Sequence, residues 1–84
     1  MGKVLKEWSD GSVSIAVEAG KDDMNSEKTH VHIYKRGRRT KSRIPGKNLD
    51  LDNRDYDTAY KLFNDNFREI ERWCKDVEAG KYDG

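Results

Sequence analysis

Apolar residues recur at every second position in two stretches of the N-terminal half of the chain. Val13, Ile15 and Val17 alternate with smaller or polar residues, and Val31 and Ile33 continue the pattern in the next stretch. A repeat of two residues is typical of a strand with one buried face. The pattern, with its intervening glycine turns, predicts antiparallel strands over about residues 3–8, 13–19, 29–36 and 38–44.

The C-terminal half follows a different period. From about Tyr56 to Val77 the apolar residues lie three or four positions apart, which is the pattern of an amphipathic helix. Gly80 is a natural C-terminal stop, and Asp52 or Asp55 is placed to cap the start. We therefore predict one long helix over about residues 56–79, packed on one face of a three- or four-stranded antiparallel sheet, which is an α+β fold.

The length of 84 residues fits a single domain over residues 1–84. Completion of the core by formation of a homodimer is an alternative that the sequence leaves open. Cys74 is the sole cysteine, so no disulfide can form within the chain. The first 25 residues contain no apolar signal-peptide core, and no apolar run approaches the roughly 18 residues of a membrane span. We expect a cytoplasmic protein that does not enter a membrane.

Charge is distributed unevenly, although the net charge is only +1. Residues 28–48 contain eight lysine or arginine residues and no acid, whereas the segments before and after them are net negative. A long basic block in an otherwise acidic chain indicates a surface that attracts anions. Gly37 can form a tight turn within this block, so the block is expected to be a hairpin rather than a helix.

The predicted hairpin would gather rings and cations on the face of the sheet that the helix leaves open. Side chains alternate across a strand, so Tyr34 would point outward beside Arg39 and Lys41. Cations neutralise phosphates, and flat rings stack on bases. We therefore expect a non-enzymatic module that binds a phosphate-bearing ligand, namely RNA, DNA or a nucleotide. The candidate binding residues are His30, His32, Tyr34, Lys35, Arg36, Arg38, Arg39, Lys41 and Arg43.

Other interpretations of these residues remain open. A basic hairpin also keeps a sheet edge soluble, and its cations could pair with acids elsewhere in the chain. A chain with two charge poles also suits a bacterial or phage inhibitor, or an antitoxin-like protein, that binds and blocks a protein partner such as a host-defence nuclease. His30 and His32 are two potential metal ligands, which is too few for a site, so neither a metal nor a cofactor is predicted. His32 as a general base is the catalytic alternative.

The stretch Thr29-His30-Val31-His32-Ile33-Tyr34-Lys35-Arg36-Gly37 resembles the His-x-His strand of a family of small prokaryotic and phage domains of unknown function. Members often have a second short strand and then a helix that ends near a tryptophan, a position that Trp73 would occupy here. The resemblance covers about half of the chain and departs from the family at Thr29, where proline is frequent. The association of that family with toxin–antitoxin-like gene pairs implies a regulatory or inhibitory binding role.

Overall fold

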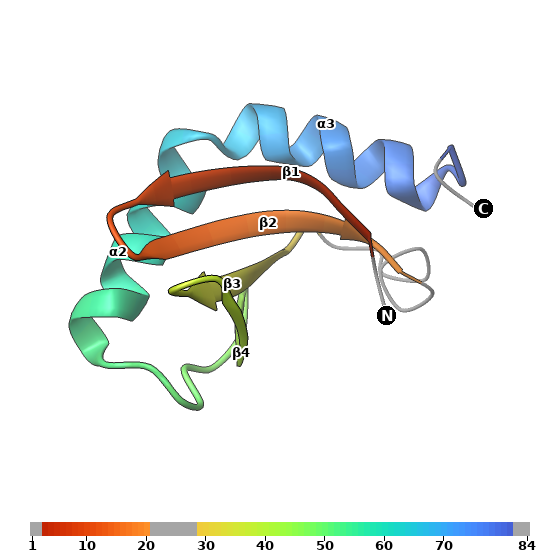
Figure 1. Ribbon diagram of the computed structural model, residues 1–84. Coiled ribbons are helices and arrows are strands. Elements are labelled where there is room, and N and C mark those ends of the chain that lie inside the picture. Colours follow the sequence, from red (N-terminus) through yellow and green to blue (C-terminus); the bar gives the residue numbers. More distant parts are fainter. Residues whose placement is uncertain (1–2, 21–28, 82–84) are drawn as a thin grey trace.

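The computed structural model describes residues 3–20 and 29–81, which form a four-stranded antiparallel sheet and two helices (Figure 1). The strands follow one another in the sheet in the order β1-β2-β3-β4. Their bounds are β1, Lys3–Asp10; β2, Val13–Ala19; β3, Val31–Lys35; and β4, Arg38–Ile44. The helices are α2, Asn53–Asp65, and α3, Phe67–Glu78. The predicted α+β class with an antiparallel sheet is confirmed.

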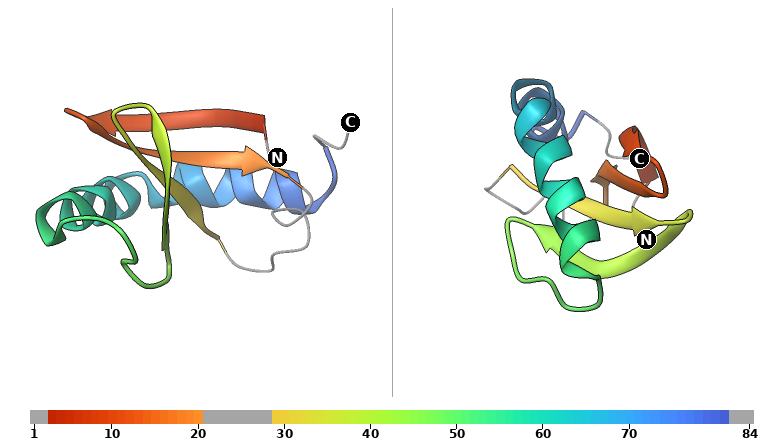
Figure 2. Two further views of the ribbon diagram at one scale, coloured as in Figure 1. Left: turned by 60° about the horizontal axis from the view of Figure 1, so that its bottom comes forward. Right: turned by 90° about the vertical axis from the view of Figure 1, so that its left-hand side faces the viewer.

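Both helices lie on the same side of the sheet, and the β3–β4 hairpin runs at a steep angle to β1 and β2 (Figure 2). The core lies between the two layers. Ile15, Ile33, Ile44 and Ile70 are completely buried, because the alternating strand positions meet the apolar stripe of the helices. Among the described residues, no helix is both long and apolar enough to cross a bilayer.

The prediction of one long helix is wrong, because the helical segment is interrupted at Asn66. The backbone there has φ −118° and ψ 17°, and the Asn66 side-chain amide donates a hydrogen bond of 2.9 Å to the carbonyl of Leu62. Asparagine favours such local hydrogen bonds over a continuous helix. The first helix also begins at Asn53, three residues earlier than predicted, and Asp52 at its N-cap makes no side-chain capping bond.

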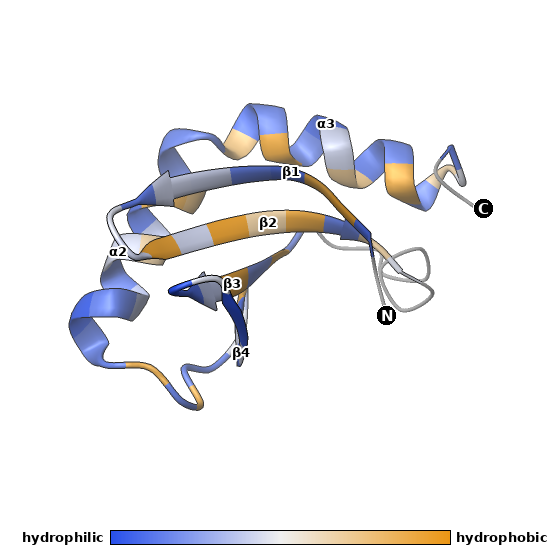
Figure 3. Ribbon diagram, viewed as in Figure 1, coloured by the Kyte–Doolittle hydropathy of each residue, from blue (hydrophilic) through white to orange (hydrophobic). Residues whose placement is uncertain are grey.

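Phe67 follows this interruption and is 39% exposed, although its place in the apolar stripe predicts burial. Its ring packs edge-on against Phe63, with 5.4 Å between ring centroids, instead of entering the core. Figure 3 shows apolar positions alternating along β2, whereas β4 is almost entirely hydrophilic. The most polar strand therefore lies at one end of the strand order, at an edge of the sheet.

The β3–β4 turn consists of Arg36 and Gly37, both with positive φ (52° and 78°). Two successive positive φ values match the right-handed twist of a hairpin, and glycine adopts them without strain. Arg36 bears a steric cost there, and its N–H donates a hydrogen bond of 2.8 Å to the carbonyl of Ser12. This bond ties the tip of the basic hairpin to the β1–β2 turn and so fixes the direction of β4.

The outer edge of β4 is covered by the loop that follows it. Ser42 is completely buried, and its hydroxyl accepts hydrogen bonds from the N–H groups of Leu49 and Asp50, at 2.9 and 3.3 Å. The Asp50 carboxylate accepts the Lys41 N–H at 2.9 Å, and this bond is the main reason that its pKa lies below the usual value. The loop therefore satisfies edge groups that would otherwise pair with another strand.

Candidate functional site

The strand register brings two rows of residues together on the face that points away from the helices. Ala16 pairs with His32, which pairs with Arg43; in the next row, Tyr34 pairs with Arg39. Directly paired residues of antiparallel strands share a face. His32, Tyr34, Arg39 and Arg43 therefore lie on one surface, which we call the open face.

A buried carboxylate that the sequence analysis missed lies beneath these residues. Glu18 is 2% exposed, and each of its oxygens has a partner. The Tyr34 hydroxyl donates to Oε2 at 2.7 Å, and Nη2 of Arg39 lies 3.3 Å from Oε1. A buried charge is stable only when it is paired in this way. The alternation along β2 does place Glu18 on the same face as Ala16, but the register that brings it to Tyr34 and Arg39 cannot be read from the sequence.

Tyr34 serves as a neutral donor in this cluster. Burial, the hydrogen bond to Glu18 and the negative charge of Glu18 together raise the pKa of Tyr34 to about 12. The phenol therefore stays protonated at physiological pH and holds the carboxylate. Its hydroxyl is engaged and its ring is half-buried, so the structure gives Tyr34 a supporting place rather than that of an exposed stacking platform.

Arg39 is held by a single nitrogen. Besides its contact with Glu18, Nη2 lies 2.8 Å from Nδ1 and 3.3 Å from Nε2 of His32. A guanidinium can only donate, so Nδ1, at the shorter distance, accepts this bond. Within the described part of the chain, no hydrogen bond involves Nη1 or Nε of Arg39, and the side chain is 44% exposed. Arg39 is thus oriented by one nitrogen, and its contacts leave the N–H groups of Nη1 and Nε unused in the described residues.

A shallow, open depression lies beside this cluster. Its lining consists of His32, Arg39, Thr40, Lys41 and Arg43 and includes no carboxylate. The Thr40 hydroxyl donates to the carbonyl of Ile33 at 2.8 Å, which leaves the three cations as the dominant groups. Among the residues that the structure describes, no carboxylate lies within ion-pair distance of the side chain of Lys41 or Arg43.

The remaining predicted site residues lie apart from the depression. Lys35 lies opposite Val13 of β2 and Arg38 of β4 in the register, so Lys35 and Arg38 face the helix side of the sheet. There the Lys35 side chain forms an ion pair of 2.9 Å with Asp55. Arg36 is exposed at the turn. The His30 ring stands edge-on to His32, with centroids 5.5 Å apart, but does not line the depression. No group of three potential metal ligands occurs within residues 3–20 and 29–81.

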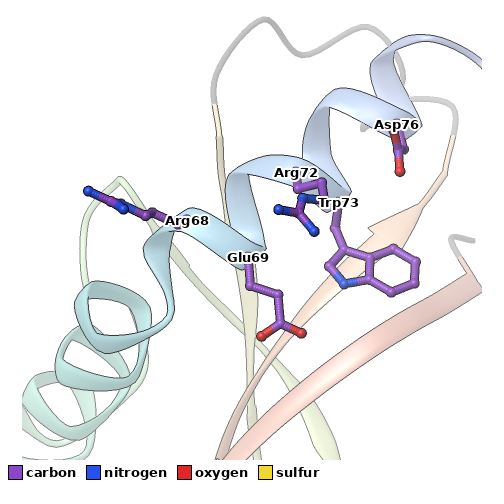
Figure 4. Close-up of a pocket in the computed structure, with 5 residues that line it drawn as sticks. All are labelled: Arg68, Glu69, Arg72, Trp73 and Asp76. Carbon is purple, nitrogen blue, oxygen red and sulfur yellow. The ribbon is translucent and has the colours of Figure 1, made fainter.

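A second depression lies along α3, on the opposite layer (Figure 4). Figure 4 shows Glu69 and Trp73 projecting to one side of the helix, while Arg68 points away. Arg72 and Asp76 complete the lining, so two cations and two carboxylates balance each other. This composition contrasts with the acid-free depression on the open face and does not favour an anionic ligand.

Comparison of the chain with protein-family models, with curated proteins and with solved structures found no match. The resemblance of the His-x-His strand to the family described above therefore stays a prediction.

Proposed function

We propose that this protein binds a phosphate-bearing ligand, namely RNA, DNA or a nucleotide, in the depression on the open face. One observation carries the proposal: Arg39, Lys41 and Arg43 surround one depression whose lining contains no acid. Cations that served only to solubilise an edge, or to pair within the chain, would be expected to alternate with acids. The geometry here suits charge-assisted hydrogen bonds to phosphate oxygens.

Glu18 supports this proposal rather than opposing it. The carboxylate neutralises one charge of the site, which lowers the general attraction for anions. In return, it fixes the guanidinium of Arg39 before a ligand arrives, so less conformational entropy is lost on binding. A surface arginine without such a partner would sample many rotamers, whereas the depression offers a preformed donor.

The test is a charge reversal of the two cations that have no described carboxylate partner. The double variant Lys41→Glu/Arg43→Glu should bind fluorescent single-stranded RNA or DNA at least about tenfold more weakly, because each charge-assisted contact contributes roughly 1.5–3 kcal/mol. The slope of log affinity against log salt concentration should also fall, by about 0.7 for each phosphate that these cations neutralise on a single strand. Fluorescence anisotropy at several salt concentrations measures both quantities.

The matched control is Arg54→Glu/Arg68→Glu, which changes the net charge by the same amount. Both arginines are exposed and lie in the first turns of α2 and α3, where an acid is favourable. The control should bind within about twofold of the wild type, because both exposed arginines lie on the helical layer, across the sheet from the depression, and salt screens such exposed charges. Unchanged binding by the Lys41/Arg43 variant, with its fold verified by circular dichroism, would refute the proposal.

A further inference from the structure

The lining of the depression carries more positive charge than the single negative charge of one phosphodiester would balance. Glu18 balances Arg39, while the side chains of Lys41 and Arg43 have no carboxylate within ion-pair distance in the described part of the chain. Asp50 accepts hydrogen bonds from the Lys41 N–H and the Ser42 hydroxyl, both at 2.9 Å, and the charge of Lys41 contributes to the lowered pKa of its carboxyl, but Asp50 does not line the depression. Two cations of the lining, Lys41 and Arg43, are therefore without an ion-pair partner in the described residues, and the lining itself contains no acid.

An internal phosphodiester carries one negative charge, whereas a phosphate monoester carries about −1.5 to −2 near neutral pH. We infer that the depression selects a phosphate monoester, the terminal phosphate of an oligonucleotide or of a free nucleotide, over the internal diesters of a nucleic acid backbone. This inference rests on the proposed function, which it narrows to one ligand chemistry.

The hydrogen-bonding groups of the depression suit a phosphate whose terminal oxygens all act as acceptors. Arg39 keeps N–H groups on Nη1 and Nε, and Arg43 and Lys41 add further donors without acceptors. The Thr40 hydroxyl already gives its proton to a main-chain carbonyl. A lining dominated by donors favours the ligand with the most charged acceptor oxygens, and a monoester has three terminal oxygens where a diester has two.

The size and shape of the site also fit the end of a chain or a small molecule. The depression has a volume of about 470 Å³, within the range of roughly 300–1,000 Å³ for small-ligand sites. A phosphate and its sugar can therefore occupy it together. The three cations surround this single hollow rather than extending over several elements, so the described site offers one strong phosphate position and no continuous track for a backbone.

The experiment compares three single-stranded oligonucleotides of one sequence that differ only at the 5′ end: a hydroxyl, a phosphate, and a phosphate blocked as its methyl ester. The blocked form has nearly the size of the phosphate but the charge of a diester. We expect the 5′-phosphate form to bind about tenfold or more tightly than the other two, the effect of one additional charge-assisted interaction. A nucleoside 5′-monophosphate serves as competitor and shows whether the free nucleotide is bound as well.

The two double variants test whether the preference for the 5′-phosphate arises at the depression. The preference should disappear in Lys41→Glu/Arg43→Glu and persist in Arg54→Glu/Arg68→Glu. Equal binding of all three oligonucleotides would overturn the inference while leaving phosphate binding itself intact. A preference that survives in the Lys41/Arg43 variant would overturn it as well, because the terminal phosphate would then lie elsewhere. If the monophosphate binds and no oligonucleotide does, the inference holds with the nucleotide as the source. Absence of binding to every probe would refute both the inference and the proposed function.

Discussion

Glu18 occupies a position that a simple pattern of charges would not favour, beneath a surface of cations. Its burial is stable because Tyr34 and Arg39 each satisfy one carboxylate oxygen, at 2.7 and 3.3 Å. Removing either partner would leave a buried charge incompletely paired, which is costly. The same contacts orient Arg39 toward His32 and the depression. The contacts that stabilise this residue cluster are therefore the same contacts that would preorganise Arg39 for the proposed ligand.

Tyr34 makes this cluster sensitive to alkaline pH. Its folded-state pKa of about 12 lies above the usual value of 10.0. The stabilisation that the protonated phenol contributes is thus complete below about pH 10 and is lost as the pH rises toward about 12. Thermal unfolding measured across this range should show a steeper loss of stability in the wild type than in Tyr34→Phe. Tyr56, whose pKa is also raised by burial, contributes equally to both proteins. Identical slopes would contradict the role given to Tyr34.

The sequence could predict which residues of β3 and β4 share the open face, because successive side chains of any strand point to opposite faces. Arg39 and Arg43 lie where that rule puts them, beside Tyr34 and His32. The ion-pair partners of the charged residues could not be predicted from the sequence. Lys35 alternates onto the helix side and reaches Asp55, which is twenty positions away in the chain. Such contacts depend on how the helix docks, which no local pattern specifies.

Among the elements, the helical segment shows what periodicity can and cannot reveal. Phe63 and Ile70 are seven positions apart and both are buried, so the apolar stripe keeps its phase across the interruption at Asn66. A pattern that stays in phase predicts one continuous helix. The break is local to Asn66, whose side-chain amide and backbone N–H both donate to the Leu62 carbonyl, so it leaves the stripe unchanged.

The edge strand β4 depends on Ser42 for its attachment to the following loop. Replacing Ser42 with alanine leaves the N–H groups of Leu49 and Asp50 without their acceptor. We expect a loss of about 1–3 kcal/mol in the free energy of unfolding, measured by urea denaturation, because the buried hydroxyl of Ser42 is the shared acceptor of these two part-buried hydrogen bonds. The amide of Leu49 should also exchange its hydrogen faster.

Ser14→Ala is the matched control for this prediction. Its hydroxyl contacts only the exposed hydroxyl of Ser9, at 2.9 Å, in the described part of the chain. The control should lose less than about 1 kcal/mol, since water can replace the missing partner. Equal losses in the two variants would show that the loop does not depend on Ser42.

At the scale of the whole molecule, the helical layer and the open face of the sheet have different compositions. The helices cover one side of the sheet and close the core (Figures 1 and 2), and acids and bases are mixed along them, whereas β4 carries the cations of the open face. This concentration of cations on the hairpin arises directly from the acid-free basic block of the sequence. It allows the basic hairpin to remain largely unpaired: in the described residues, Lys35 and Arg39 are the members of the hairpin that form ion pairs.

The central claim is that the open face, and not the helical layer, receives a phosphate group. The most direct measurement is a titration of the isotopically labelled protein with a 5′-phosphorylated single-stranded oligonucleotide, followed by nuclear magnetic resonance. The account predicts that saturable shift changes gather at His32, Arg39, Lys41 and Arg43, while α2 and the outer face of α3 stay unchanged. Changes concentrated around Arg72 and Trp73, or no saturable change anywhere, would contradict it.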